Sequence, residues 1–151
     1  MDPSWRRALR VVLFLVVPGF CAAFIAGCAK VLLEPATMKV ERRSIVRVTV
    51  LNVESDLLEF EVENLSKEPL VIIKSEIVIE TVVGTIKHPP GTKTPVFEVL
   101  PGGKQKVALK FSVKGMQRGD PFEVHFDRAI RQRGQPVALD SVLFYVAHAP
   151  G

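Results

Sequence analysis

The sequence predicts an all-β domain, an antiparallel β-sandwich of about seven or eight strands. Apolar and polar residues alternate with period two through most of the chain after residue 38, for example over residues 58–63. Turn-forming residues separate these runs at regular intervals, and no part of this region has a helical stripe of apolar residues. Such alternation is typical of strands that bury one face and expose the other to water.

Seven runs carry the strand pattern. The first, residues 46–50, alternates valines with Arg47 and Thr49. The second, residues 58–63, places three glutamates on the face opposite its apolar side chains. A long third run, residues 70–81, is rich in Ile and Val. The remaining predicted strands are residues 96–100, 107–114, 122–127 and 142–146.

Turn signals lie between the runs. Residues 64–69 are mostly polar and end at Pro69, which lacks the N–H that a strand ladder needs. The Pro-Gly-Gly at 101–103 predicts a tight reversal, and the Gly-Asp-Pro at 119–121 predicts another. A longer basic connection is expected over residues 128–136. No domain boundary or internal repeat interrupts this pattern.

Residues 1–27 have the layout of a secretory signal peptide, which we expect to be helical. Arg6, Arg7 and Arg10 form a positively charged start, and an apolar segment follows over residues 11–26. This segment is shorter than the roughly 20 residues that a stable membrane span needs. It ends in an aliphatic residue, two small residues and a cysteine, namely Ile25, Ala26, Gly27 and Cys28.

These four residues resemble the lipobox of bacterial lipoproteins. The resemblance implies a diacylglycerol thioether on Cys28, cleavage after Gly27, and a further acyl chain such as palmitate on the new amino terminus. Two or three acyl chains are enough for lasting membrane association. Ala29 stands where aspartate would favour the inner membrane, so we expect an outer-membrane lipoprotein that faces the periplasm. The alternative is an unmodified signal anchor in which Cys28 is an incidental thiol.

The resemblance divides the chain into three parts: the signal peptide (residues 1–27), a lipidated start with a short tether (28–37), and the sandwich domain (38–148). Removal of the signal takes three arginines and one aspartate from totals of 20 basic and 16 acidic residues, which leaves a net charge of +2. This balance gives no reason to expect nucleic-acid binding. Cys21 leaves with the signal, so the mature chain cannot form an internal disulfide.

Residues 60–114 resemble immunoglobulin-like accessory domains, including the water-stress type of β-sandwich. An acidic alternating strand leads into Asn64, and Leu-Pro-Gly-Gly at 100–103 leads into another alternating strand. The Cys…Trp…Cys core of antibody-type domains is absent, because the one tryptophan is Trp5 in the signal. The resemblance therefore implies the sandwich architecture and no particular activity.

The sequence predicts no catalytic residues, no metal site and no cofactor. His88, His125 and His148 have no metal-ligand spacing and are expected at the surface. The serines, among them Ser66 and Ser141, have no obvious neighbouring base. The glutamates of residues 58–63 could form a calcium or acid–base site, but alternate glutamates on a strand are more typical of a solvated face.

One basic cluster is a candidate binding site: Arg128, Arg131 and Arg133 in the connection 128–136. Such a loop could contact lipid phosphates or an acidic partner, or it could simply be a soluble hairpin loop. Two hypotheses follow. The first is a non-catalytic envelope lipoprotein that binds another envelope protein or supports an assembly. The second is a ligand-binding or enzyme-accessory domain that holds a lipid, glycan or metal between its sheets.

Overall fold

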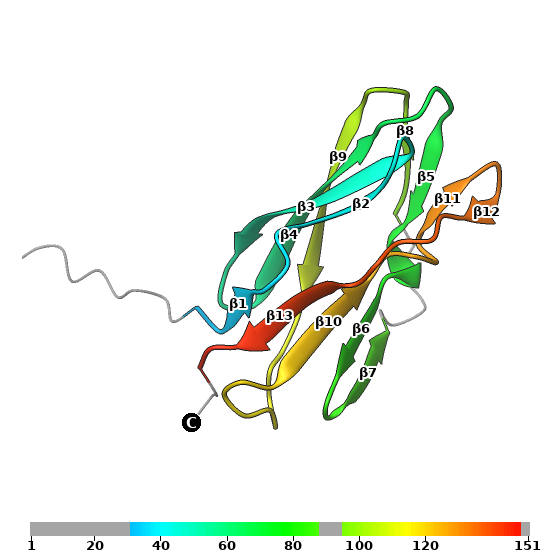
Figure 1. Cartoon of the computed structure of the whole chain (residues 1–151). Helices are drawn as coiled ribbons and strands as arrows, with labels where there is room; N and C mark the ends of the chain where they lie inside the picture. Colours follow the sequence, from blue (N-terminus) through cyan, green and yellow to red (C-terminus); the bar gives the residue numbers. More distant parts are fainter. Residues whose placement is uncertain (1–30, 88–94, 149–151) are drawn as a thin grey trace, which may run out of the picture.

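The computed structural model describes residues 31–87 and 95–148 of the chain (Figure 1). It confirms the predicted all-β class, because every sheet is antiparallel and the described residues contain no α-helix. The predicted signal peptide and lipobox lie outside the described residues. The thirteen strands of the described part are β1 (Leu33–Pro35), β2 (Lys39–Arg42), β3 (Val46–Val53), β4 (Leu57–Asn64), β5 (Leu70–Ile73), β6 (Val78–Thr81), β7 (Gly84–Lys87), β8 (Val96–Val99), β9 (Lys104–Lys110), β10 (Pro121–His125), β11 (Ile130–Gln132), β12 (Gln135–Pro136) and β13 (Val142–Val146).

The strands form two layers. One layer is the sheet β2-β3-β4-β9, in which long antiparallel pairs run side by side. The other layer consists of two sheets, β1-β13-β10-β6-β7 and β12-β11-β5-β8. The chain passes from one of these two sheets to the other between β5 and β6 and again between β10 and β11. Figure 1 shows the two sheets end to end.

Alternate residues of both layers meet in the core. In β4 every second residue is buried, and its glutamates point to the other face. The Phe60 ring contacts the rings of Phe126 and Phe144 edge to face, with centroids 5.0 Å and 6.2 Å apart. Phe122 and Phe111 extend this aromatic cluster, with 5.5 Å between their centroids. Edge-to-face contacts add to the free energy gained from burying the rings.

The domain begins earlier than residue 38. Within the predicted tether 28–37, residues Leu33–Pro35 form strand β1, which pairs with the last strand, β13. Leu33 is fully buried. The Val31 carbonyl oxygen lies 3.1 Å from the His148 ring nitrogen Nδ1, and the Ala147 N–H donates to the Leu32 carbonyl. The chain therefore joins the sandwich within a few residues of Cys28.

The strand count of about seven or eight was too low, because short strands lack a readable alternation. The sequence pattern missed β1, β2 and β7, and the expected connection 128–136 contains the hairpin β11–β12. The predicted run 70–81 is two strands separated by a 3-10 turn at Lys74–Glu76, where the chain changes sheets. The predicted strand 107–114 begins earlier and ends at Lys110, although Phe111 and Val113 remain buried.

Candidate functional site

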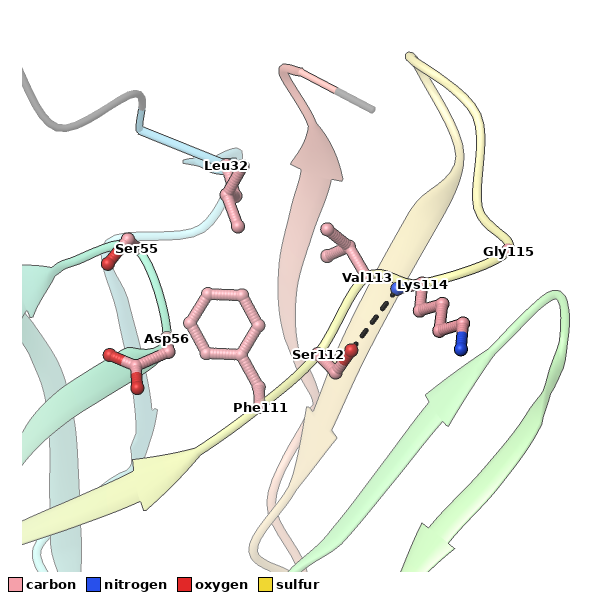
Figure 2. Close-up of a pocket in the computed structure, with 8 residues that line it drawn as sticks. All are labelled: Leu32, Ser55, Asp56, Phe111, Ser112, Val113, Lys114 and Gly115. Carbon is pink, nitrogen blue, oxygen red and sulfur yellow. Dashed lines mark hydrogen bonds between the residues drawn. The ribbon is translucent and has the colours of Figure 1, made fainter. Parts of the chain in front are cut away.

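The end of the sandwich where the chain enters with β1 carries an open pocket of about 520 Å³. We call this the β1 end: residues 31–33, 54–56, 111–120 and 147–148. The apolar side chains of Leu32, Phe111 and Val113 line the pocket together with polar residues of the adjoining turns. In Figure 2 the Phe111 ring lies in its middle, with the Asp56 carboxylate and the Lys114 ammonium on opposite sides.

The polar groups of this pocket do not converge on one point. The Ser112 hydroxyl oxygen accepts a hydrogen bond from the Lys114 backbone N–H at 3.3 Å, and the Asp56 carbonyl accepts from the Phe111 N–H at 3.0 Å. Both bonds hold the turns in place. What remains exposed to a ligand is a mainly apolar surface, so the pocket suits an apolar chain better than a charged or polar ligand.

The opposite end of the sandwich carries a second open pocket, of about 490 Å³. Three turns that are far apart in the sequence meet there: residues 42–45, 65–69 and 132–135. We call this the three-turn end, and Figure 1 shows these turns at the end away from β1. Hydroxyl, amide and charged groups line this pocket, among them Ser44, Ser66, Lys67, Gln132, Arg133 and Gln135.

Asn64 organises the three-turn end. It is the one buried polar side chain in the described ranges. Its Nδ2 donates to the carbonyls of Glu68 and Val99 at 2.7 Å and 2.8 Å. Its Oδ1 accepts from the backbone N–H and the hydroxyl of Ser66 at 2.9 Å and 2.8 Å. Gln132 then donates to the Ser66 hydroxyl at 2.9 Å, which connects two residues that line the pocket.

The three arginines of the predicted basic cluster are engaged differently. Arg131 forms an ion pair at 2.6 Å with Glu76, which follows the end of β5. Arg133 forms an ion pair with Glu68, which precedes the start of β5. Arg128 is exposed, and its carbonyl is 3.5 Å from Nε of Arg131. The arginines therefore do not form a single patch, and of the three only Arg133 lines the pocket at the three-turn end.

Glutamates of β4 take part in a ladder of ion pairs across the outer face of the sheet. Arg47 lies 2.9 Å from both Glu41 and Glu63, and the Lys104 ammonium lies 2.8 Å from Glu61. The Arg47 hydrogen bond lowers the pKa of Glu41 from its ordinary 4.5. The Glu61 carboxylate raises the pKa of Lys104 above its ordinary 10.5. Carboxylates neutralised in this way fit a solvated, ion-paired strand face.

This ladder gives a pH-dependent prediction. Because the folded-state pKa of Glu41 is lowered, its pairing with Arg47 stabilises the fold above about pH 4.5, and this contribution is lost as the pH falls through the lowered pKa. We therefore expect Arg47→Met to lower the urea midpoint slightly at pH 7. The difference from the unmodified chain should shrink as the pH falls below 4.5.

Arg118→Met is the matched control, because Arg118 is an exposed turn arginine that forms no ion pair in the described residues. Its urea midpoint should follow that of the unmodified chain at every pH. If the difference in urea midpoint between Arg47→Met and the chain without substitutions stays constant from pH 7 to the acid range, the role given to Glu41 is contradicted.

Sequence reasoning missed a cluster around His125. The histidine lies on the outer face of β10, but it is only partly exposed, and its Nε2 is buried without a hydrogen-bond partner in the described residues. Nε2 lies 3.4 Å from a Glu80 oxygen and 3.6 Å from a Glu123 oxygen. The Ser141 hydroxyl donates to Glu123 at 2.9 Å. The strand register creates this cluster, because it places Glu123 of β10 opposite Glu80 of β6 on one side and Leu143 of β13 on the other. The register cannot be predicted from the sequence.

Ser141 therefore has a carboxylate beside it, in contrast to the expectation of an isolated serine. Its hydroxyl bonds to Glu123 and not to the His125 ring, so the three residues do not have the serine–histidine contact of a nucleophile and its base. No group of three or more His, Cys, Asp or Glu residues in the described ranges is arranged to hold a metal ion.

Comparisons with protein-family models, with curated proteins and with solved structures gave no match for this chain. Over residues 31–87 and 95–148, no helix is both long and apolar enough to cross a bilayer. The two ends of the sandwich are therefore the candidate sites: an apolar pocket at the β1 end and a polar, basic pocket at the three-turn end.

Proposed function

We propose that this protein is a lipid-anchored envelope lipoprotein whose β-sandwich is a non-catalytic module for binding another envelope protein or supporting an envelope assembly. The observation that carries the proposal is the order Ile25, Ala26, Gly27, Cys28 at the end of a charged and then apolar N-terminus. The start of the sandwich at Leu33 supports it, because a folded domain then follows closely after the proposed acylated cysteine.

The short connection has a consequence for orientation. Val31 is the third residue after Cys28, and an extended chain advances about 3.3–3.6 Å per residue. An acyl anchor on Cys28 would thus keep the β1 end within about 10 Å of the bilayer surface. The three-turn end would face away from that membrane. Ala29 favours the outer membrane, with the domain in the periplasm.

Engaged polar groups support a non-catalytic role. The glutamates Glu61 and Glu63 are held by Lys104 and Arg47, and the Ser66 hydroxyl bonds within its own turn. These groups act in holding strands and turns together. The membrane, through the acyl chains, and an envelope protein are the proposed partners, and no cofactor is needed.

A ligand-binding or accessory domain is the second candidate function. The observation that favours it is the pocket at the β1 end, with Leu32, Phe111 and Val113 in its lining. Of the lipid, glycan and metal ligands that such a domain could hold, this apolar lining favours a lipid chain. Binding of a radiolabelled fatty acid would support this second function if Phe111→Asp abolishes the binding and Tyr145→Asp retains it.

The anchor is tested by replacing Cys28. In bacterial cells the chain without substitutions is expected in the membrane fraction. Its intact mass should equal that of residues 28–151 plus acyl chains. Cys28→Ala should remove the acyl mass and the membrane association. Cys21→Ala, the matched control within the proposed signal, should change neither. A Cys28→Ala chain that loses its signal and still sediments with membranes would show that the acyl anchor is the wrong explanation.

A further inference from the structure

The three-turn end has an excess of positive charge. Its turns, residues 42–45, 65–69 and 132–135, carry four cationic side chains and one carboxylate. That carboxylate, Glu68, is paired with Arg133. Arg43 and Lys67 are exposed and form no ion pair in the described part of the chain. Their charges are therefore available to a ligand of opposite sign.

The residue at the tip of the β11–β12 hairpin is locally unfavourable. Gln132 pairs with Gln135, so Arg133 and Gly134 form a two-residue turn, with φ of 51° and 76°. Positive φ at both positions defines a type I′ turn, which prefers Asn, Asp or Gly at its first position. Arginine is strained at this position, so it does not serve the stability of the turn. A binding role for its side chain at the surface explains its presence better.

Ser44 extends this observation. Ser44 and Arg133 are the two non-glycine residues with positive φ in the described ranges, and both line the same pocket. Around them the amides of Gln132 and Gln135 and the Lys67 ammonium supply hydrogen-bond donors. Within the described part of the chain no aromatic ring lines the pocket, which gives a sugar no described ring on which to stack. Cations combined with amides suit carboxylates and peptide groups.

We propose that the three-turn end is the docking site for an acidic segment of a partner protein. Glutamate or aspartate side chains of that segment contact Arg43, Lys67 and Arg133, and its backbone bonds to the glutamine amides. The proposal rests on the interaction role proposed above and deepens it by giving the surface and the chemistry of the partner. This surface points away from the β1 end, so docking and anchoring do not compete.

The test uses the full chain, extracted from membranes in detergent, and an immobilised glutamate–alanine repeat peptide as the probe. The glutamine–alanine counterpart and polygalacturonate are the comparison probes. The double variant Arg43→Glu/Lys67→Glu is expected to weaken binding of the acidic peptide at least about tenfold. The matched double variant Lys114→Glu/Arg118→Glu makes the same change of net charge at the β1 end and should weaken it less than about twofold.

Arg133→Asn separates docking from folding. Asparagine suits the first position of the type I′ turn, so its thermal midpoint should equal or exceed that of the unmodified chain while binding of the acidic peptide weakens. Equal effects of the two double variants would overturn the proposal. Tighter binding of polygalacturonate than of the acidic peptide would also overturn it and would indicate an anionic glycan. Equal binding of the glutamate peptide and the glutamine peptide would overturn it as well.

The same preparation keeps the two proposals apart, because its intact mass reports acylation. An acylated chain that does not bind the acidic peptide would refute the docking site and leave the lipoprotein proposal in place. A chain without acyl groups that binds the peptide, and loses binding in the Arg43/Lys67 variant, would refute only the anchor.

Discussion

Replacing Asn64 by alanine is expected to lower the free energy of unfolding by about 2–5 kcal/mol, which is a large share of the stability of a small domain. The side chain is fully buried, and it makes two donor and two acceptor bonds. Alanine would leave the Ser66 N–H and the Val99 carbonyl without these bonds. A buried polar group without a partner costs about 1–3 kcal/mol.

Urea unfolding followed by circular dichroism measures the effect, since the one tryptophan lies in the proposed signal. Asn52→Ala is the matched control, because the amide of Asn52 bonds to Glu54 at an exposed position. We expect it to change the stability by less than about 0.5 kcal/mol. Similar losses for the two variants would mean that the Asn64 bonds are not what holds the turns together.

Replacing Phe60 by alanine is expected to cost about 3–5 kcal/mol, the usual range for a buried aromatic residue. The ring is fully buried in β4, and it packs edge to face on Phe126 and Phe144 of the opposite layer. Alanine would remove both aromatic contacts and leave a cavity between the sheets, because the two layers can close only partly around it.

The same urea experiment measures this loss, with Tyr145→Ala as the control. Tyr145 is an aromatic residue of β13 with 43% of its surface exposed, so its removal should cost less than about 1 kcal/mol. Phe60→Leu, which keeps part of the apolar volume, should lie between the two. A Phe60→Ala stability within 1 kcal/mol of the unmodified chain would contradict a core centred on this aromatic cluster.

The long strands could be predicted because their alternation is set by burial. β3 and β4 each have enough residues for period-two patterning to stand out, and both formed where expected. Short strands such as β7 and β12 have too few residues for a period to be recognised. Their existence depends on pairing with β6 and β11, which is a tertiary contact.

The candidate sites were harder to predict than the strands. The signal and the lipobox are local patterns, so Cys28 could be proposed from the sequence alone. The pocket at the three-turn end joins residues as distant as Ser44 and Gln135, and only the fold brings them together. Arg133 belongs to the basic cluster that the sequence predicts, but its separation from Arg131 follows from their partners at opposite ends of β5.

The pairing of β1 with β13 ties the first described strand to the last. A chain made from its N-terminus produces β1 long before β13, so Leu33 has no strand to pair with until residues 142–146 have emerged. Non-local pairing of this kind slows folding and leaves early strands exposed. The sandwich therefore cannot close at β1 before residues 142–146 are available. Removing residues 142–146 would release β1 as well, and with it the segment that leads to Cys28.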